Sequence, residues 1–182
     1  MPDQLDVGLL LEAVAERAVA FFREDLALEA VRERRGVEDA QEIRLRHLTS
    51  LLVLEGNSKL YIAFSFEKSL IEHAFQVYSD DIEVAEEERE GYVEETAGDM
   101  INIIVGNATA RLPAGGGAVA ISTPIVISEA KSIFRHKDAR FYSASLETDY
   151  GKMDVYCIGP KELFGDVFPG LPSQGACCRR DC

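Results

Sequence analysis

The stretch ETAGDMINIIVGNA, residues 95–108, has the composition of a buried helix and decides how the rest of the chain is interpreted. Most of its side chains are apolar, yet Glu95, Asp99 and Asn102 place two carboxylates and an amide within it. At 100° per residue these groups fall, together with Gly106 and Thr109, within an arc of roughly 80°. The sequence therefore predicts a helix that is buried on most sides and carries one narrow polar stripe, formed by these five residues.

The polar stripe has two explanations. Surface helices ordinarily carry a solvated polar face, and the stripe could be no more than that. Solvated faces are usually built from Lys, Glu, Arg and Gln, whereas this one ends in Gly106 and Thr109, small residues that let another surface approach. Asp99 and Asn102 are three residues apart, so their side chains project side by side and could reach one small target. An amide can orient a water and a carboxylate can bind a cation, which is chemistry without a nucleophile of its own.

Size and charge restrict the class of protein. A chain of 182 residues is long enough for one core, and we expect a single domain over residues 1–162. The formal net charge of -13, from 32 acidic and 19 basic residues, argues against nucleic acid and anionic membranes as partners. The first residues lack a basic leader pattern and no apolar run reaches the length of a membrane span. A cytoplasmic location is expected.

Four cysteines do not form a zinc motif. Cys157 lies in an apolar run, while Cys177, Cys178 and Cys182 crowd the last six residues. Two adjacent cysteines with a third four positions on, and no histidine nearby, do not match a tetrahedral zinc spacing. We expect residues 163–182 to form an irregular surface tail, and no metal site is predicted.

Periodicity and turn residues divide the chain into helices and strands. Residues 6–24 have helical spacing, with Asp6 as candidate N-cap. The segment 26–39 is ambiguous between a continued helix and an edge strand ending near Gly36, and a strand is favoured. The acidic run of residues 80–95 is expected to open the long helix, which extends through residue 110 and stops before Pro113. The other expected elements are strands at 42–56, 58–66, 117–128, 139–147 and 151–159 and a short helix at 67–79.

The order of these elements predicts the fold. A helix, three strands and a short helix are followed by a second long helix and three more strands. This order predicts a pseudo-two-fold repeat of an α-β-β-β unit. Short strands joined by hairpins imply a mainly antiparallel sheet, and two long helices covering it give an α+β fold.

The residues of the long helix resemble a known family. The stretch AGDMINIIVGNA, residues 97–108, is similar to the characteristic helix of the CheX and CheC family of chemotaxis phosphatases. The family pattern has an acidic residue or Ser, a Glu four positions later, an Asn three after that, and a Pro some twenty residues further on. Glu95, Asp99, Asn102 and Pro124 stand at these places. The resemblance extends over residues 6 to about 160.

The first helix decides between the two branches of this family. CheC-like proteins have two such sites, with a Glu and Asn pair on each long helix. Here Glu12 is followed three positions later by Ala15, Glu16 is followed by Val19, and the helix contains no asparagine. One site remains, so the chain resembles CheX. That resemblance implies a homodimer whose subunits pair through their sheets.

The resemblance also implies an activity, the dephosphorylation of a CheY-type response regulator. Asn102 would position the attacking water and Asp99 would pair with a regulator lysine. Glu95 would be a secondary contact, and Gly106 and Thr109 would complete the edge against which the partner lies. No cofactor of its own is implied, since Mg2+ would be held by the regulator. Positioning and electrostatics dominate such phosphoryl transfer, which fits a site without a catalytic Cys, Ser or His. The histidines His47, His73 and His136 are scattered over a predicted strand, a helix and a loop.

One residue departs from the family pattern. Asp99 stands where Glu is usual, which shortens the reach of the carboxylate by roughly 1.3 Å, and a misplacement of about 1 Å can cost about 10²-fold in rate. One alternative is therefore a non-catalytic dimeric CheX-like domain that binds a response regulator or another signalling partner. Another is a structural dimerisation domain whose polar stripe faces water.

Overall fold

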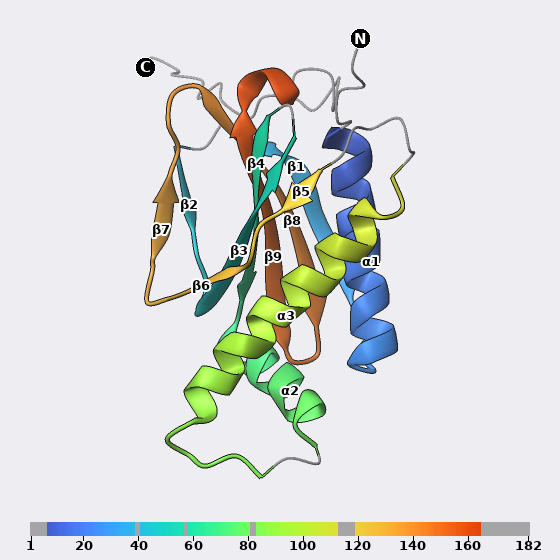
Figure 1. Cartoon of the computed structure of the whole chain (residues 1–182), viewed down its shortest axis with the longest axis vertical. Helices are drawn as coiled ribbons and strands as arrows, with labels where there is room; N and C mark the ends of the chain where they lie inside the picture. The colour runs from blue at the N-terminus through green and yellow to red at the C-terminus, as the bar shows by residue number, and fades with distance from the viewer. Residues whose placement is uncertain (1–6, 39–40, 57, 81–82, 113–118, 165–182) are drawn as a thin grey trace, which may run out of the picture.

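The computed structural model describes residues 7–38, 41–56, 58–80, 83–112 and 119–164, and these residues form an α+β fold with an antiparallel sheet and three helices (Figure 1). The candidate cap Asp6 and most of the predicted tail, residues 165–182 with their three cysteines, lie outside the described residues. The helices are α1 (Val7–Asp25), α2 (Lys68–Tyr78) and α3 (Arg89–Thr109), and a short 3₁₀ helix follows at Lys161–Leu163.

Among the described residues, seven strands form the main sheet, and their pairings are antiparallel. The strand order is β1-β8-β9-β4-β3-β5, and β6 also pairs with β3. A separate two-stranded sheet joins β2 (Glu42–Arg44) to β7 (Ser132–Phe134). The strands of the main sheet are β1 (Val31–Glu38), β3 (Leu48–Glu55), β4 (Lys59–Phe66), β5 (Ala120–Ile121), β6 (Ile125–Ser128), β8 (Ala139–Thr148) and β9 (Gly151–Pro160).

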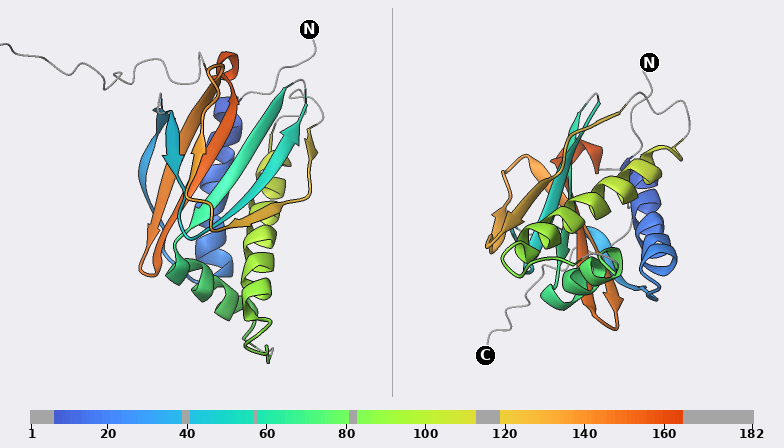
Figure 2. Two further views of the ribbon diagram at one scale, coloured as in Figure 1. Left: turned by 90° about the vertical axis from the view of Figure 1, so that its left-hand side faces the viewer. Right: turned by 60° about the horizontal axis from the view of Figure 1, so that its bottom comes forward.

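Helices α1 and α3 pack on one face of the main sheet, where the larger core lies (Figure 2). Side chains alternate between the faces of a strand, so Met153, Val155 and Cys157 of β9 point into this core. Helix α1 buries Leu10, Val14 and its neighbours on the same face. A Val, Leu or Phe side chain contributes about 1.5–3 kcal/mol when fully buried. The α1 residues buried are Val7, Leu10, Leu11, Val14, Ala15, Ala18, Phe21 and Phe22.

The opposite face of the sheet carries a smaller core and a polar network. The small core joins Ile43 of β2 to sheet residues, among them Tyr156. Beside it, Arg46 donates from Nε to Asp154 Oδ2 at 2.6 Å and from Nη2 to Asp154 Oδ1 at 3.1 Å. Ser145 donates to the same carboxylate, as does the Tyr156 hydroxyl. We call these residues, with Glu67 paired to Arg46, the Arg46 network.

The ambiguous segment after α1 is a strand, as predicted: β1 lies at the edge of the sheet and pairs with β8. The hairpin between β3 and β4 is also confirmed, with Leu48 opposite Phe66 and Glu55 opposite Lys59. The β8–β9 hairpin closes with Thr148 opposite Gly151. Gly151 has a φ of 124°, a conformation that favours glycine at this turn.

Two predicted strands are each divided in the structure. The segment 42–56 contains β2 and β3 with Leu45, Arg46 and His47 between them, so His47 lies before a strand and not within one. The segment 117–128 is interrupted around Pro124, which has no N–H to donate to a ladder, and β5 and β6 lie on either side of it. The short strand β7 was not predicted.

Helix α3 begins later than predicted. Its first residue is Arg89, and residues 83–88 lie in a non-helical connection and a turn. Of the acidic run, Glu90 lies in the first turn of the helix, where a carboxylate interacts favourably with the helix dipole. The predicted end is confirmed within one residue, since the helix ends at Thr109 and Ala110 is its C-cap.

The internal repeat stays a prediction. Exchanging β1 with β6, β3 with β8 and β4 with β9 returns the order of these six strands in reverse, and the same exchange relates β2 to β7. A two-fold repeat would produce this order. Helices α1 and α3, of 19 and 21 residues, occupy equivalent places before the first strand of each half.

Candidate functional site on helix α3

Helix α3 carries the candidate site because one side of it is held by the core and the other is left to solvent. Met100, Ile101, Ile104 and their neighbours are buried against the sheet and α1. Burial of that face stabilises the helix without the help of the stripe. The buried residues of the helix are Thr96, Ala97, Met100, Ile101, Ile104, Val105 and Ala108.

The first three residues of the polar stripe are exposed. Glu95, Asp99 and Asn102 all face solvent from consecutive turns of α3. Within the described ranges, the side chains of Asp99 and Asn102 form neither an ion pair nor a hydrogen bond, so their polar groups are not required by the fold. A carboxylate and an amide with these properties are available to a partner.

The last two residues of the stripe contribute shape more than hydrogen bonds. Gly106 is half-buried, and a Cβ atom added there would meet no atom within 4 Å beyond the neighbouring residues and backbone of the helix itself. This side of the helix is therefore open at Gly106. The Thr109 hydroxyl already donates to the carbonyls of Val105 and Gly106, at 3.0 and 2.9 Å.

Pro124 lies beside the helix at the level of the site. A Cβ atom added to Gly98 would lie 3.9 Å from the Cβ of Pro124 and 3.7 Å from Val126 Cγ2, which are ordinary contact distances. Strand β6 and the residue before it therefore flank α3 next to Asp99. The family-pattern proline and the stripe are separated in sequence but adjacent in the structure.

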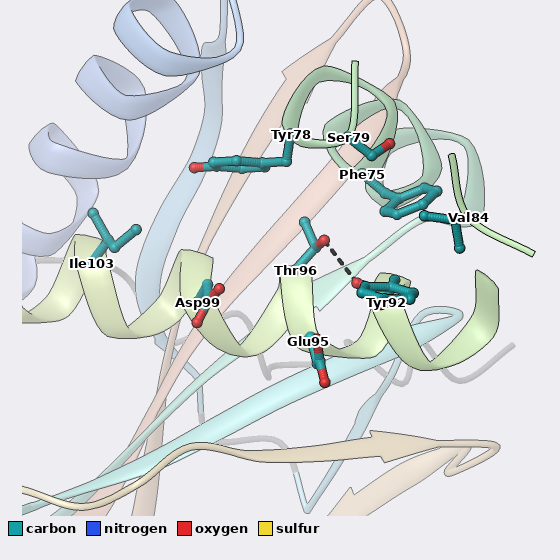
Figure 3. A pocket seen from close by; sticks show the side chains of 9 residues that line it. All are labelled: Phe75, Tyr78, Ser79, Val84, Tyr92, Glu95, Thr96, Asp99 and Ile103. Carbon is teal, nitrogen blue, oxygen red and sulfur yellow. Dashed lines mark hydrogen bonds between the residues drawn. The ribbon is translucent and has the colours of Figure 1, made fainter. Parts of the chain in front are cut away.

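On the other side of the stripe, a cavity of about 250 Å³ opens between α2 and α3 (Figure 3). Glu95 and Asp99 line it, whereas Asn102 does not. Its walls are mostly aromatic and aliphatic, and we call it the α2–α3 cleft. The residues lining it are Phe75, Tyr78, Ser79, Val84, Tyr92, Glu95, Thr96, Asp99 and Ile103.

Tyr78 stands at the junction of the three helices and lines the cleft. Its ring lies 6.4 Å from that of Phe21 of α1, centroid to centroid. Burial, with the carboxylates of Asp25 and Asp99 adding to it, raises the pKa of Tyr78 to about 12. Its hydroxyl therefore stays protonated at pH values at which an ordinary tyrosine ionises.

The cleft walls are what the sequence pattern did not reveal. Ile103 belongs to the apolar part of the helix, which the sequence predicts to be buried, but it is 38 % exposed and lines the cleft. Tyr92, 40 % exposed, lies one turn before Glu95. The signal available in the sequence was that these apolar residues border the polar stripe on the helix. The α2 residues could not be found this way, because only tertiary packing brings them to α3.

The remaining chemically active side chains lie elsewhere. His73 of α2 stacks on Tyr150 with ring centroids 3.6 Å apart, and the ring of His136 is exposed near Asp138. Burial raises the pKa of the Cys157 thiol, which lies in the main core. Among the described residues no cluster of three or more His, Cys, Asp or Glu side chains could hold a metal ion.

Comparison with known proteins relates this geometry to one family. The sequence matches the family described as "Chemotaxis phosphatase CheX" over residues 48–146, more than half of the chain. Curated proteins included no relative with significant sequence similarity. In the described part of the chain, no helix has the length and apolarity needed to span a membrane.

Solved structures share the fold at low sequence identity. A CheX from Desulfovibrio desulfuricans has a TM-score of 0.70 at 16% identity, over 82% of this chain and 98% of that one. A CheX from Vibrio vulnificus has a TM-score of 0.66 at 17% identity, over 81% and 97%. The CheX–CheY–BeF3–Mg2+ complex of Borrelia burgdorferi contains a chain with a TM-score of 0.61 at 21% identity, over 82% and 96%.

Proposed function

Since the chain belongs to the CheX family of chemotaxis phosphatases, we propose that it accelerates hydrolysis of the aspartyl phosphate of a CheY-type response regulator. The observation that carries the proposal is the exposure of Asp99 and Asn102 on neighbouring turns of α3, without partners in the described part of the chain. A solved complex of a CheX with CheY supports the class of partner.

In this proposal Asn102 enters the active site of the regulator and orients the attacking water. Its amide has a donor end and an acceptor end, so it can fix both the position and the orientation of that water. Asp99 pairs with a lysine of the regulator and holds the register of docking. The attacking water and the phosphoryl group then form the P–O bond while the bond to the aspartyl oxygen breaks, releasing inorganic phosphate. The chain contributes positioning and charge, which are the main requirements of phosphoryl transfer.

The rest of the assembly follows from the same proposal. Mg2+ would be bound by the regulator, and the chain would supply no metal ligand. The chain would act as a homodimer paired through its sheets; in the described structure β1 and β5 end the strand order, and β6 pairs with β3 alone. Such a partner would place the protein in the cytoplasm.

The test follows the decay of phosphorylated CheY-type regulators encoded in the same genome, with and without the protein. Wild type should accelerate decay of at least one regulator, and Asn102→Ala should remove the acceleration. Asn107→Ala is a matched control, because Asn107 is also an exposed asparagine of α3 but points about 120° away from Glu95 around the helix. No acceleration by wild type, or acceleration kept in Asn102→Ala, would contradict the proposal.

The second candidate is a dimeric domain that binds the regulator, or another signalling protein, without catalysis. The shorter side chain of Asp99 favours it, because the carboxylate reaches less far than the usual Glu. Binding of the phosphorylated regulator without faster decay would establish this candidate. Acquisition of activity by Asp99→Glu would then identify the missing methylene as the cause.

A further inference from the structure

The α2–α3 cleft lies beside the proposed catalytic residues but is not needed for the reaction assigned to them. It shares Asp99 and Glu95 with the polar stripe, and Phe75 and Tyr78 of α2 line it from the other helix (Figure 3). We propose that the cleft receives an arginine side chain of the regulator, distinct from the lysine that pairs with Asp99, and thereby selects the cognate partner. The inference rests on the proposed function and names a specificity site for it.

The size of the cleft fits one long side chain. A volume of about 250 Å³ is below the roughly 300–1,000 Å³ typical of sites for small organic ligands. It is nevertheless several times larger than the volume of one water molecule in the liquid, which is about 30 Å³. A side chain from a docked protein surface fills such a space without requiring a separate ligand.

The charge of the cleft favours a cation. Its two ionisable acids, Glu95 and Asp99, are exposed at its rim, and none of the residues that line it is basic. The rim therefore presents two carboxylates that have no ion-pair partner among the described residues. The whole chain carries a net charge of -13, which would attract a basic partner surface over a distance of about a Debye length.

The aromatic walls favour arginine over lysine. Tyr92 and Phe75 lie with ring centroids 6.5 Å apart and planes tilted by 30°, and Tyr78 lines the cleft beside them. A guanidinium group is planar and weakly hydrated, so it stacks on such rings more readily than an ammonium group. One contact of this kind is already present in the protein, because the Arg89 guanidinium carbon lies 4.9 Å from the centroid of the Phe75 ring.

The experiment is a set of double-mutant cycles on binding, independent of catalysis. The probe is a CheY-type regulator held in its active form by BeF3 and Mg2+, with its exposed arginines and lysines replaced by Ala one at a time. Tyr92→Ala should weaken binding of the wild-type regulator about tenfold, within the range of a desolvated cation–π contact. Replacement of one regulator arginine should weaken binding to the wild-type protein about tenfold. The same replacement should not weaken binding to the Tyr92→Ala protein, because the aromatic contact is already absent there. Glu95→Gln provides the second cycle and should couple to the same arginine.

Tyr61→Ala is the matched control, since Tyr61 is 41 % exposed, close to the 40 % of Tyr92, but lies on β4 and not in the cleft. It should leave binding within twofold of wild type. If wild type binds and dephosphorylates the regulator but no arginine couples to Tyr92 or Glu95, the cleft assignment is wrong and the proposed function stands. Coupling to a lysine would also refute it. If wild type binds no CheY-type regulator, the proposed function fails, and the cleft assignment fails with it.

Discussion

Two groups of polar side chains in the described part of the molecule differ in their hydrogen bonding. In the Arg46 network the Asp154 carboxylate accepts hydrogen bonds from Arg46, Ser145 and Tyr156. On α3, Asp99 and Asn102 have no such partners within the described residues. The side chain of Asp154 is 14% exposed, whereas both α3 residues are exposed to solvent.

The difference separates groups that serve the fold from groups that are free to serve a partner. A buried charge is costly unless it is paired, so the Arg46 network is explained by the requirements of folding alone. Burial by itself would lower the pKa of Arg46, but the hydrogen bond to Asp154 and the nearby carboxylates outweigh it and raise that pKa. Asp99 and Asn102 have no comparable role in the described structure, and this is why we propose that they contact a partner.

The largest expected effect is on the α3 side of this comparison. Asn102→Ala should lower the regulator dephosphorylation rate by about 10²–10³-fold, the usual loss when one preorganised polar group is removed from a reacting centre. The free energy of unfolding should stay within about 0.5 kcal/mol of wild type, because Asn102 is exposed and unpaired in the described structure. Phosphate release and urea unfolding measure the two quantities. A large loss of stability would assign Asn102 to the fold instead.

The Arg46 network should show the opposite response. Asp154→Ala leaves the Arg46 guanidinium without its bidentate partner and should cost about 2–3 kcal/mol of stability, less than a fully buried pair because Arg46 is 24% exposed. The dephosphorylation rate per folded molecule should not change. Glu55→Ala, which breaks an exposed pair with Lys59, is the control and should cost less than about 0.5 kcal/mol. Equal losses of unfolding free energy in Asp154→Ala and Glu55→Ala would show that the Arg46 network does not stabilise the fold more than an exposed ion pair.

A smaller effect is expected from restoring the family's usual residue. Asp99→Glu should raise the dephosphorylation rate roughly tenfold, because the carboxylate gains about 1.3 Å of reach toward the regulator lysine. Single-turnover decay of the phosphorylated regulator measures it. An unchanged or lower rate would show that docking has already adjusted to the aspartate.

Gly106 offers a test in which stability and binding move in opposite directions. Gly106→Ala should stabilise the fold by about 0.5–1 kcal/mol, because glycine is unfavourable within a helix and the added Cβ meets no atom within 4 Å. The added methyl should nevertheless weaken regulator binding, since it stands where the partner is proposed to approach. Urea unfolding and titration with the BeF3-activated regulator give the two results. Unchanged binding would show that the interface with the regulator does not extend to Gly106.

The last effect concerns Tyr78 and is absent at neutral pH. Its pKa in the folded protein is about 12, above the ordinary value of 10, so folding favours the neutral phenol. This contribution to stability is fully present below pH 10 and is lost as the pH rises from 10 toward 12. Tyr78→Phe should therefore flatten the decline of unfolding free energy over that interval, as measured by urea titration at several pH values. An identical decline in both proteins would show that Tyr78 is not the group responsible.

The sequence allowed the elements with strong periodicity to be predicted, including α1, α2, the body of α3 and the β3–β4 and β8–β9 hairpins. It failed where pairing with distant residues decides the structure. Strand β2 has only three residues and exists because β7 pairs with it, so no local pattern distinguishes it from the start of β3. The acidic residues before Arg89 were predicted to be helical, but residues 83–88 form a non-helical connection and a turn, and the helix begins at Arg89.

The candidate site could be predicted to a similar extent. Spacing alone placed Glu95, Asp99 and Asn102 on one exposed side of α3, and the structure agrees with that placement. Spacing did not separate Asn102 from the two acids, although only the acids line the α2–α3 cleft. The walls of that cleft come from two helices, and their approach depends on packing that one helix cannot encode.

The position of β1 has a consequence for how the chain reaches its native state. Within the described structure the sheet partner of β1 is β8, which begins more than one hundred residues later at Ala139. During synthesis β1 must therefore wait, with its ladder groups unpaired, until most of the chain has emerged. Closing so long a loop is a slow step, because its entropic cost precedes the contacts that repay it. Completion of this edge is expected to be the rate-limiting event of folding, while the β3–β4 hairpin forms early from local contacts.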